Sequence, residues 1–289
     1  MPAAGSASAE ASHERRVAVR RILRHRGIVV GGLLLLAMVI GALIAPFVVG
    51  DPQELNPIAR LMPPGEEAWF GTDHLGRDIF TRTLHGGRVS LLVGLSVAVL
   101  ASTFGTVIGL VAGFVRSADG PLMRIMDGVM AIPAILLAIA MVAVTRPSVA
   151  NVVFAVTVVE TPRVARLVRS VVLTIREQPY IEAAFASGTR VPRILLRHVL
   201  PNTAAPLIVQ ATYVAAAAIL IESLLSFLGT GTPAAIPTWG NIVAEGRTYF
   251  QIATWIIFFP GLFLAITVLA INLLGDGLRD LLDPRHTDR

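Results

Sequence analysis

The sequence predicts an all-α integral membrane protein with six transmembrane helices, and three observations support this fold class. Of its 289 residues, 54% are hydrophobic and only 15% are charged, whereas soluble domains carry about 25% charged residues. The uncharged run 28–49 has the length of the roughly 20 helical residues that cross a hydrocarbon core. Five further, largely apolar runs follow it along the chain.

The spans follow one another with short or charged connections. In chain order, the six predicted spans are residues 28–49, 89–114, 124–144, 148–163, 203–226 and 253–275. The first span is longer than the 7–15 apolar residues of a signal peptide, so we expect it to remain as an uncleaved helix. The fourth span is short.

The second span carries three glycines, Gly105, Gly109 and Gly113, at intervals of four residues. This spacing repeats the G-x-x-x-G pattern on one helix face, where the absence of side chains lets another helix approach closely. The pattern therefore predicts tight packing of this face against a neighbouring helix.

The distribution of arginine predicts the orientation. All 24 basic residues are Arg, and alternate loops divide them 18 to 6. Because the arginine-rich side faces the cytoplasm, we expect both termini there. The resulting map has a cytoplasmic N-terminal tail 1–27, a transmembrane domain 28–275, outside loops 50–88 and 227–252, a cytoplasmic loop 164–202 and a cytoplasmic C-terminal tail 276–289. The arginines form no single patch, so nucleic acid is not an expected partner.

Two missing residue types limit the chemistry. The chain has no Cys, which excludes disulfides and thiolate metal sites. It has no Lys, which excludes a Walker A site for ATP and a Schiff base. No span contains His, and no two His have the i, i+4 metal spacing. We therefore expect no enzyme, no catalytic residue, no metal site and no cofactor bound by this chain.

The cytoplasmic loop contains the most informative segment. Pro179 can open a short helix and Gly188 can end it. Within it, Ala183 and Ala184 give a small, flat face, and Glu182 offers a charge. Such a helix suits docking into the groove of a partner protein. It also suits lying on anionic lipid, and the residues alone leave both interpretations open.

The order of motifs resembles a known family. Glu182-Ala-Ala, then Gly188, then Leu200-Pro201 resembles the signature of ABC importer permeases. His198 stands where the general pattern has Ile, as in the peptide and nickel branch. Further matching segments are Phe70–Asp78, Arg88–Gly94, Glu222–Gly229, Pro237–Gly240 and Asn272–Asp280. The resemblance covers residues 15–285 and is to the second permease of dipeptide and oligopeptide importers.

This resemblance implies a type I ABC importer permease fold in the bacterial inner membrane. It implies a homologous second permease, two ATPase domains or subunits that bind ATP and Mg, an extracytoplasmic substrate-binding protein and the lipid bilayer as partners. The residues implied to couple to the ATPase are Glu182, Ala183, Ala184, Gly188, Leu200 and Pro201. Peptide is the expected cargo, and nickel and glutathione remain alternatives. A proton-coupled secondary transporter is disfavoured, because the spans are nearly free of charge and no internal repeat is evident.

Four further polar residues are candidates. Glu222 lies inside the fifth span, where ionisable groups are expensive and usually functional. It is a candidate for the translocation path or a subunit interface, or a helix-end carboxylate that reaches the headgroups. Asp73, Arg77 and Asp78 look like a salt-linked outer loop that contacts the sister permease or the binding protein, or a self-contained loop.

Overall fold

The structure is a computed structural model that describes residues 25–282, all of them in helices, turns and loops apart from one isolated bridge between Thr72 and Asp78. The predicted tail 1–27 lies almost entirely outside the described residues, as does the end of the predicted tail 276–289. Of the arginines in these two tails, Arg26 and Arg279 lie within the described residues.

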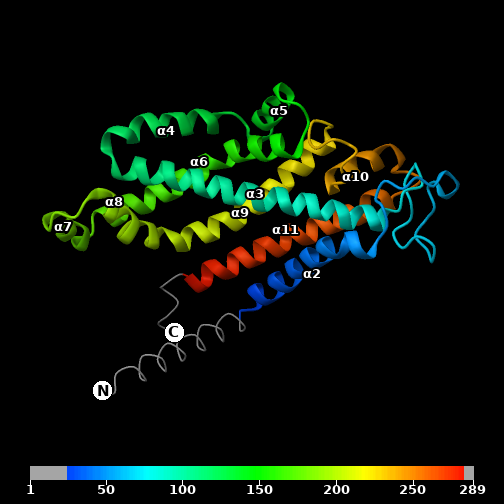
Figure 1. Ribbon diagram of the computed structural model, residues 1–289, viewed down its shortest axis with the longest axis horizontal. Helices are drawn as coiled ribbons and strands as arrows, with labels where there is room; N and C mark the ends of the chain where they lie inside the picture. Colours follow the sequence, from blue (N-terminus) through cyan, green and yellow to red (C-terminus); the bar gives the residue numbers. More distant parts are fainter. Residues whose placement is uncertain (1–24, 283–289) are drawn as a thin grey trace, which may run out of the picture.

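The long helices lie alongside one another (Figure 1). The helices are α2 (Arg26–Val48), α3 (Ile79–Phe114), α4 (Arg116–Ala131), α5 (Ala134–Val144), α6 (Val149–Arg176), α7 (Pro179–Ala186), α8 (Val191–Ile194), α9 (Leu200–Phe227), α10 (Trp239–Gly246) and α11 (Trp255–Leu282). The short helices α7 and α8 lie at one end of the molecule, and α10 lies with the long loop 49–78 at the other (Figure 1). We call these the α7 end and the α10 end.

The described part of the chain contains four helices long and apolar enough to cross a membrane. They are Arg26–Val48, Ile79–Phe114, Val191–Phe227 and Trp255–Leu282. A fifth span results if α4 and α5 are counted together. The structure thus supports an all-α membrane protein with four or five candidate spans by length and composition, and the predicted fourth span is the one that these criteria do not select.

The predicted third span, 124–144, is not one continuous helix. It breaks between α4 and α5, and the two helices meet at 91°. The cause is Pro133, because proline removes a backbone donor and disfavours the helical conformation of the residue before it. Ile132 is accordingly extended, with φ −91° and ψ 131°.

Helix α6 is longer than predicted. Residues 164–176, expected in the cytoplasmic loop, continue the helix for 13 residues beyond the predicted span. In this stretch Val164, Val168 and Val172 are buried at helical spacing, while Arg163 and Arg166 are exposed. The buried stripe keeps the segment helical although its composition is that of a surface helix. Residues 79–88 likewise belong to α3 rather than to the outside loop.

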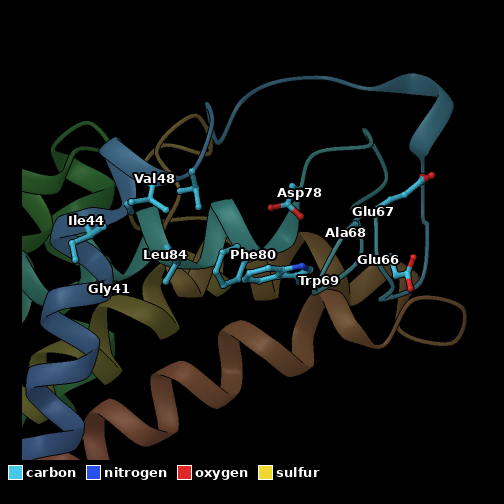
Figure 2. A pocket seen from close by; sticks show the side chains of 12 residues that line it. Gly41, Ile44, Val48, Glu66, Glu67, Ala68, Trp69, Asp78, Phe80 and Leu84 are labelled. Atoms are coloured by element: carbon cyan, nitrogen blue, oxygen red, sulfur yellow. The ribbon is translucent and has the colours of Figure 1, made fainter.

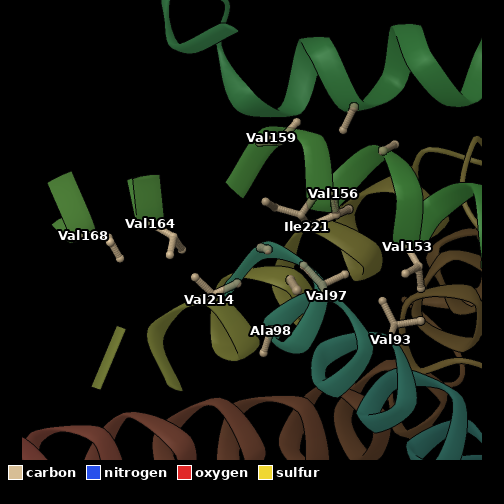
Figure 3. Packing of buried hydrophobic residues seen from close by; sticks show 14 of the residues in the cluster. Val93, Val97, Ala98, Val153, Val156, Val159, Val164, Val168, Val214 and Ile221 are labelled. Carbon is tan, nitrogen blue, oxygen red and sulfur yellow. The ribbon is translucent and has the colours of Figure 1, made fainter. Parts of the chain in front are cut away.

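The core forms where α3, α6 and α9 meet, and it is rich in valine (Figure 3). The three glycines of α3 lie against α6. A Cβ atom on Gly105 would lie 2.5 Å from Val164, one on Gly109 would lie 2.7 Å from Val168, and one on Gly113 would lie 2.7 Å from Val172. Each distance is too short for a side chain, so the predicted close helix approach is confirmed.

Candidate functional site

Helix α7 has the limits that the sequence predicts. Pro179 is in its first turn, and Gly188 follows its end with a left-handed φ of +76°. The amide of Gly188 donates to the carbonyl of Phe185, and the amide of Thr189 donates to that of Ala184, at 2.9 and 3.0 Å. This is the Schellman arrangement, which satisfies free carbonyls at a helix end and favours glycine.

One face of α7 is anchored to the rest of the chain. Ile181 is fully buried in the main core, and Ala184 packs partly buried against the same cluster. The ring of Phe185 stacks on Phe114 of α3 with centroids 5.9 Å apart. The opposite face, with Glu182 and Ala183, is exposed. The helix therefore has an inner face fixed to the core and a solvent-exposed outer face that is free to contact a partner.

The remaining two residues of the predicted coupling set lie where α9 begins. A π-helical turn, Leu195–Val199, joins α8 to α9. Leu200 is partly buried and Pro201 is exposed in the first turn of α9, a position where the missing amide of proline costs little. Tyr180 of α7 lies with its ring centroid 6.2 Å from that of His198 in the π turn. The six predicted residues thus share the α7 end.

At the α10 end, four charged side chains form a network that joins loop 49–78 to α3 and α10. Arg77 Nε donates to Asp73 Oδ2 at 2.6 Å and Arg77 Nη2 donates to Glu245 at 2.5 Å. Arg82 Nη1 donates to the same carboxylates at 2.6 and 2.7 Å. Asp73 is completely buried, and the Arg82 side chain is 2% exposed. Two anions and two cations balance one another, so the network holds the loop and the two helices together without net charge.

The structure corrects the predicted role of Asp78 in this loop. Asp78 takes no part in the salt-linked network and instead caps α3, its carboxylate accepting from the amide of Thr81 at 2.7 Å. Sequence reasoning missed Arg82 and Glu245. Because Glu245 lies 163 residues beyond Arg82, no local spacing could have indicated their contact.

The same carboxylates could be mistaken for a metal site. Oxygen and nitrogen atoms of Asp73, His74 and Glu245 lie within 4.8 Å of one another. However, Arg77 and Arg82 donate to both carboxylates, so two guanidinium groups already supply the positive charge that an ion would bring.

Glu222 lies inside the chain, near the α10 end of α9. Its side chain is fully buried. One carboxylate oxygen accepts from Ser226 at 2.8 Å, and the other accepts from Ser90 of α3 at 3.4 Å. No salt bridge to it occurs in residues 25–282. The carboxyl group reaches no surface of this chain.

A groove of 430 Å³ lies between α2, the first turns of α3 and the loop before it (Figure 2). Ile44 and Val48 of α2, with Phe80 of α3, form apolar parts of its wall. Glu66 and Glu67 come from the loop. All residues that line the groove fall within 41–49, 66–69 and 78–84, so it is confined to the α10 end.

Comparison with known proteins gives two family matches. Residues 105–288 match the family described as binding-protein-dependent transport system inner membrane component. Residues 15–64 match the N-terminal TM domain of oligopeptide transport permease C. The two matches together include most of the chain, and the first includes α7 and α9.

Curated relatives are similar over nearly their whole length. The probable peptide ABC transporter permease protein y4tQ of Sinorhizobium fredii is 50% identical, over 94% of this chain and 93% of the relative. The di/tripeptide transport system permease protein DppC of Pseudomonas aeruginosa is 44% identical, over 90% of this chain and 89% of the relative.

Among solved structures, the MetNI methionine ABC transporter in inward-facing conformations matches with a TM-score of 0.51. The identity is 22%, over 67% of this chain and 94% of that chain, which supports a shared fold. Together with the two family matches and the long relatives, the four long apolar helices lead to one conclusion. The chain belongs to the family of binding-protein-dependent transport system inner membrane components and is a multi-pass permease subunit, not itself an enzyme.

Proposed function

We propose that this chain is one of two permeases of an ABC importer that brings di- and oligopeptides into the cell. The relatives carry names that specify peptides, dipeptides or di- and tripeptides. The observation that carries the mechanism is α7, a short helix with one face held in the core and the other face open. In this proposal, a separate ATPase binds ATP and Mg and docks on that open face.

The absence of lysine supports the separate ATPase. A P-loop uses lysine to reach the nucleotide phosphates, and this chain has none. Energy for transport must then enter through a contact with another subunit. The predicted coupling residues are grouped at the α7 end, where Tyr180 and His198 bring α7 close to the beginning of α9.

We also infer six spans with both termini in the cytoplasm, and α6 supplies the sixth. Its first half, residues 149–162, is free of basic residues, and its arginines lie in the second half toward α7. A helix that crosses most of the hydrocarbon core with its first half, and leaves the membrane on the cytoplasmic side in its arginine-bearing second half, would have this composition. The orientation agrees with the positive-inside rule for the arginine-rich α7 end.

In this arrangement the α10 end faces outward and receives the substrate-binding protein. The charge network of Asp73, Arg77, Arg82 and Glu245 joins loop 49–78 to α10. A loop and a helix fixed to each other in this way would offer the binding protein a preorganised surface, which lowers the entropic cost of docking.

Uptake by the complete transporter tests the cargo. Proteoliposomes that contain both permeases, the ATPases and the binding protein would be given labelled dipeptide, hexapeptide, glutathione and nickel in parallel. We expect ATP-dependent accumulation of peptide and none of nickel. Accumulation of nickel or glutathione without peptide would overturn the proposed cargo, and accumulation without ATP would overturn the importer class.

A further inference from the structure

We propose that Glu222 is a positioning residue: it fixes the Ser226 hydroxyl that holds the loop 228–238 on α9, and it bonds α9 to α3, so that movement of α9 is passed on to that loop. The inference rests on the proposed function, in which the ATPase docks on α7, because α9 follows α7 in the chain after α8 and the π turn. The buried carboxyl group of Glu222 has no role in the proposed function as stated above.

The position of Glu222 is costly for a carboxyl group. It is completely buried in a helix that qualifies as a membrane span, and the described residues offer it hydroxyl partners rather than a cation. Ionisable side chains inside membrane spans are expensive and tend to be retained for function. A side chain that only filled space there would be apolar. The hydrogen bonds of Glu222 therefore indicate a role beyond packing.

Those hydrogen bonds extend from α9 into the loop. Ser226 donates to Glu222, and the Ser226 oxygen in turn accepts from the amide of Thr232 at 3.2 Å and lies 3.0 Å from the Thr232 hydroxyl. Asn241 of α10 donates to the same hydroxyl at 2.9 Å. It also donates to the carbonyl groups of Pro233 and Ile236. A continuous polar chain therefore runs from Glu222 through the loop to α10.

The loop and the start of α10 also pack closely against α9. A Cβ atom on Gly231 would lie 2.4 Å from the amide nitrogen of Ser226, and one on Gly240 would lie 2.6 Å from the carbonyl oxygen of Ser223. The segment is also fixed to α3, since the Trp239 indole donates to the carbonyl of Thr83 at 2.9 Å. Glu222 lies at the centre of this contact, because it alone among these groups bonds to both α9 and α3 side chains.

The opposite end of α9 begins at Leu200, directly after the π turn that follows α7 and α8. A helix of 28 residues spans about 42 Å, and a hydrogen-bonded rod of this kind transmits displacement along its length. A shift imposed on the α7 end would reach Glu222, and the polar chain would carry the loop with it. Without the carboxyl group, the Ser226 hydroxyl would lose the acceptor that fixes its orientation toward Thr232, and α9 would lose its side-chain bond to Ser90 of α3.

The test uses the complete transporter in nanodiscs, with binding protein and peptide. Three variants are compared: Glu222→Gln keeps hydrogen bonding, Glu222→Ala removes it, and Ser226→Ala cuts the chain one step later. Thr267→Val is the matched control, because this buried hydroxyl in α11 has no hydrogen-bond partner among the described residues. The measurements are basal ATP hydrolysis, its stimulation by the loaded binding protein, and hydrogen exchange of residues 230–241 with and without trapped ATP.

We expect wild type, Thr267→Val and Glu222→Gln to show an ATP-dependent change in exchange at 230–241 and full stimulation. In Glu222→Ala and Ser226→Ala that change should be lost, and stimulation should fall at least tenfold while basal hydrolysis stays within twofold. Unchanged exchange and stimulation in Glu222→Ala would overturn the proposal. So would an equal loss in Glu222→Gln, because charge would then be the essential property, and so would a parallel loss of basal hydrolysis, which indicates only a folding role. Failure of the wild-type transporter to take up labelled peptide in the proteoliposome assay would contradict the proposed cargo. The exchange measurement with trapped ATP would still decide the role of Glu222.

Discussion

At the scale of single residues, Ala183 and Ala184 are neighbours in α7 with different surroundings. Ala183 is exposed, whereas Ala184 packs against the main core. The sequence predicts a small face that both residues share. The structure divides their roles, because Ala183 faces outward and Ala184 keeps the helix close to its own chain.

This division predicts different outcomes for large side chains. Ala183→Trp should leave the protein inserted but should reduce coupled uptake at least tenfold, because the indole would occupy the space of a docked ATPase. Ala184→Asp should also lower the amount of folded protein, because it places a carboxylate against the core. Uptake and substrate-stimulated hydrolysis in proteoliposomes, with insertion measured by accessibility labelling, separate the effects. Wild-type coupling in Ala183→Trp would contradict the docking assignment.

Gly109 gives a second prediction at this scale. Valine at this position would bring its Cβ to 2.7 Å from the Ala165 carbonyl oxygen and from Val168. Overpacking of a dense core costs about 1–3 kcal/mol, so Gly109→Val should unfold at a lower temperature in detergent. Gly32→Val is the control, because nothing lies within 4 Å of the Cβ position of Gly32. Equal melting temperatures for both variants would mean that α3 and α6 are less closely packed than described.

At the scale of the elements, the position of α7 on one side of the membrane can be tested directly. The 18-to-6 division of arginines predicts that α7 is cytoplasmic and that loop 50–88 is outside. Because the chain has no native Cys, single substitutions report cleanly. In intact cells a membrane-impermeant thiol reagent should label Ile58→Cys and should not label Ser187→Cys. Both positions are exposed, so reversed labelling would refute the orientation.

The elements also show which structural features can be predicted from sequence alone. The limits of α7 were predictable, because Pro179 and Gly188 act within one helical turn. The close contact of α3 was predictable from glycine spacing, although its partner α6 was not. The 91° bend at Pro133 was missed, because an apolar composition obscured the effect of one proline. The length of α6 was missed, because a segment rich in arginine is typical of a loop. The helical spacing of the valines between the arginines is the signal that was overlooked.

The candidate sites also differ in how far the sequence alone predicts them. The coupling residues could be named from a local motif, and the structure places them together at the α7 end. The ion network could be predicted only in part, since Asp73 and Arg77 are four residues apart while Glu245 comes from a distant helix. The predicted contacts of Asp73, Arg77 and Asp78 with partner proteins remain predictions.

At the scale of the whole molecule, the apolar surface of α4 and α5 requires a cover. Ile125, Ile132 and Leu136 are 59%, 46% and 58% exposed. Lipid could cover such side chains, but α4 also exposes Arg124 and Asp127 on the same short helix. Gly128 of α4 has nothing within 4 Å of its Cβ position, which leaves room for the close approach of another helix. We expect this face to meet the sister permease.

Pairing with the sister permease gives the last prediction. Even the six proposed spans are few to surround a solute path, so the path should lie between two chains, with this chain supplying one wall. Gly128→Trp should therefore abolish co-purification with the homologous permease and reduce uptake at least tenfold. Gly32→Trp, which places the same side chain in an equally open site on α2, should retain both. The measurement is the amount of sister permease recovered on tagged chain from solubilised membranes, normalised to inserted protein. Uptake by vesicles that contain this permease and the ATPases but no sister would contradict the shared path. Co-purification that survives Gly128→Trp would contradict the assignment of α4 to the interface and would indicate another exposed face of the chain.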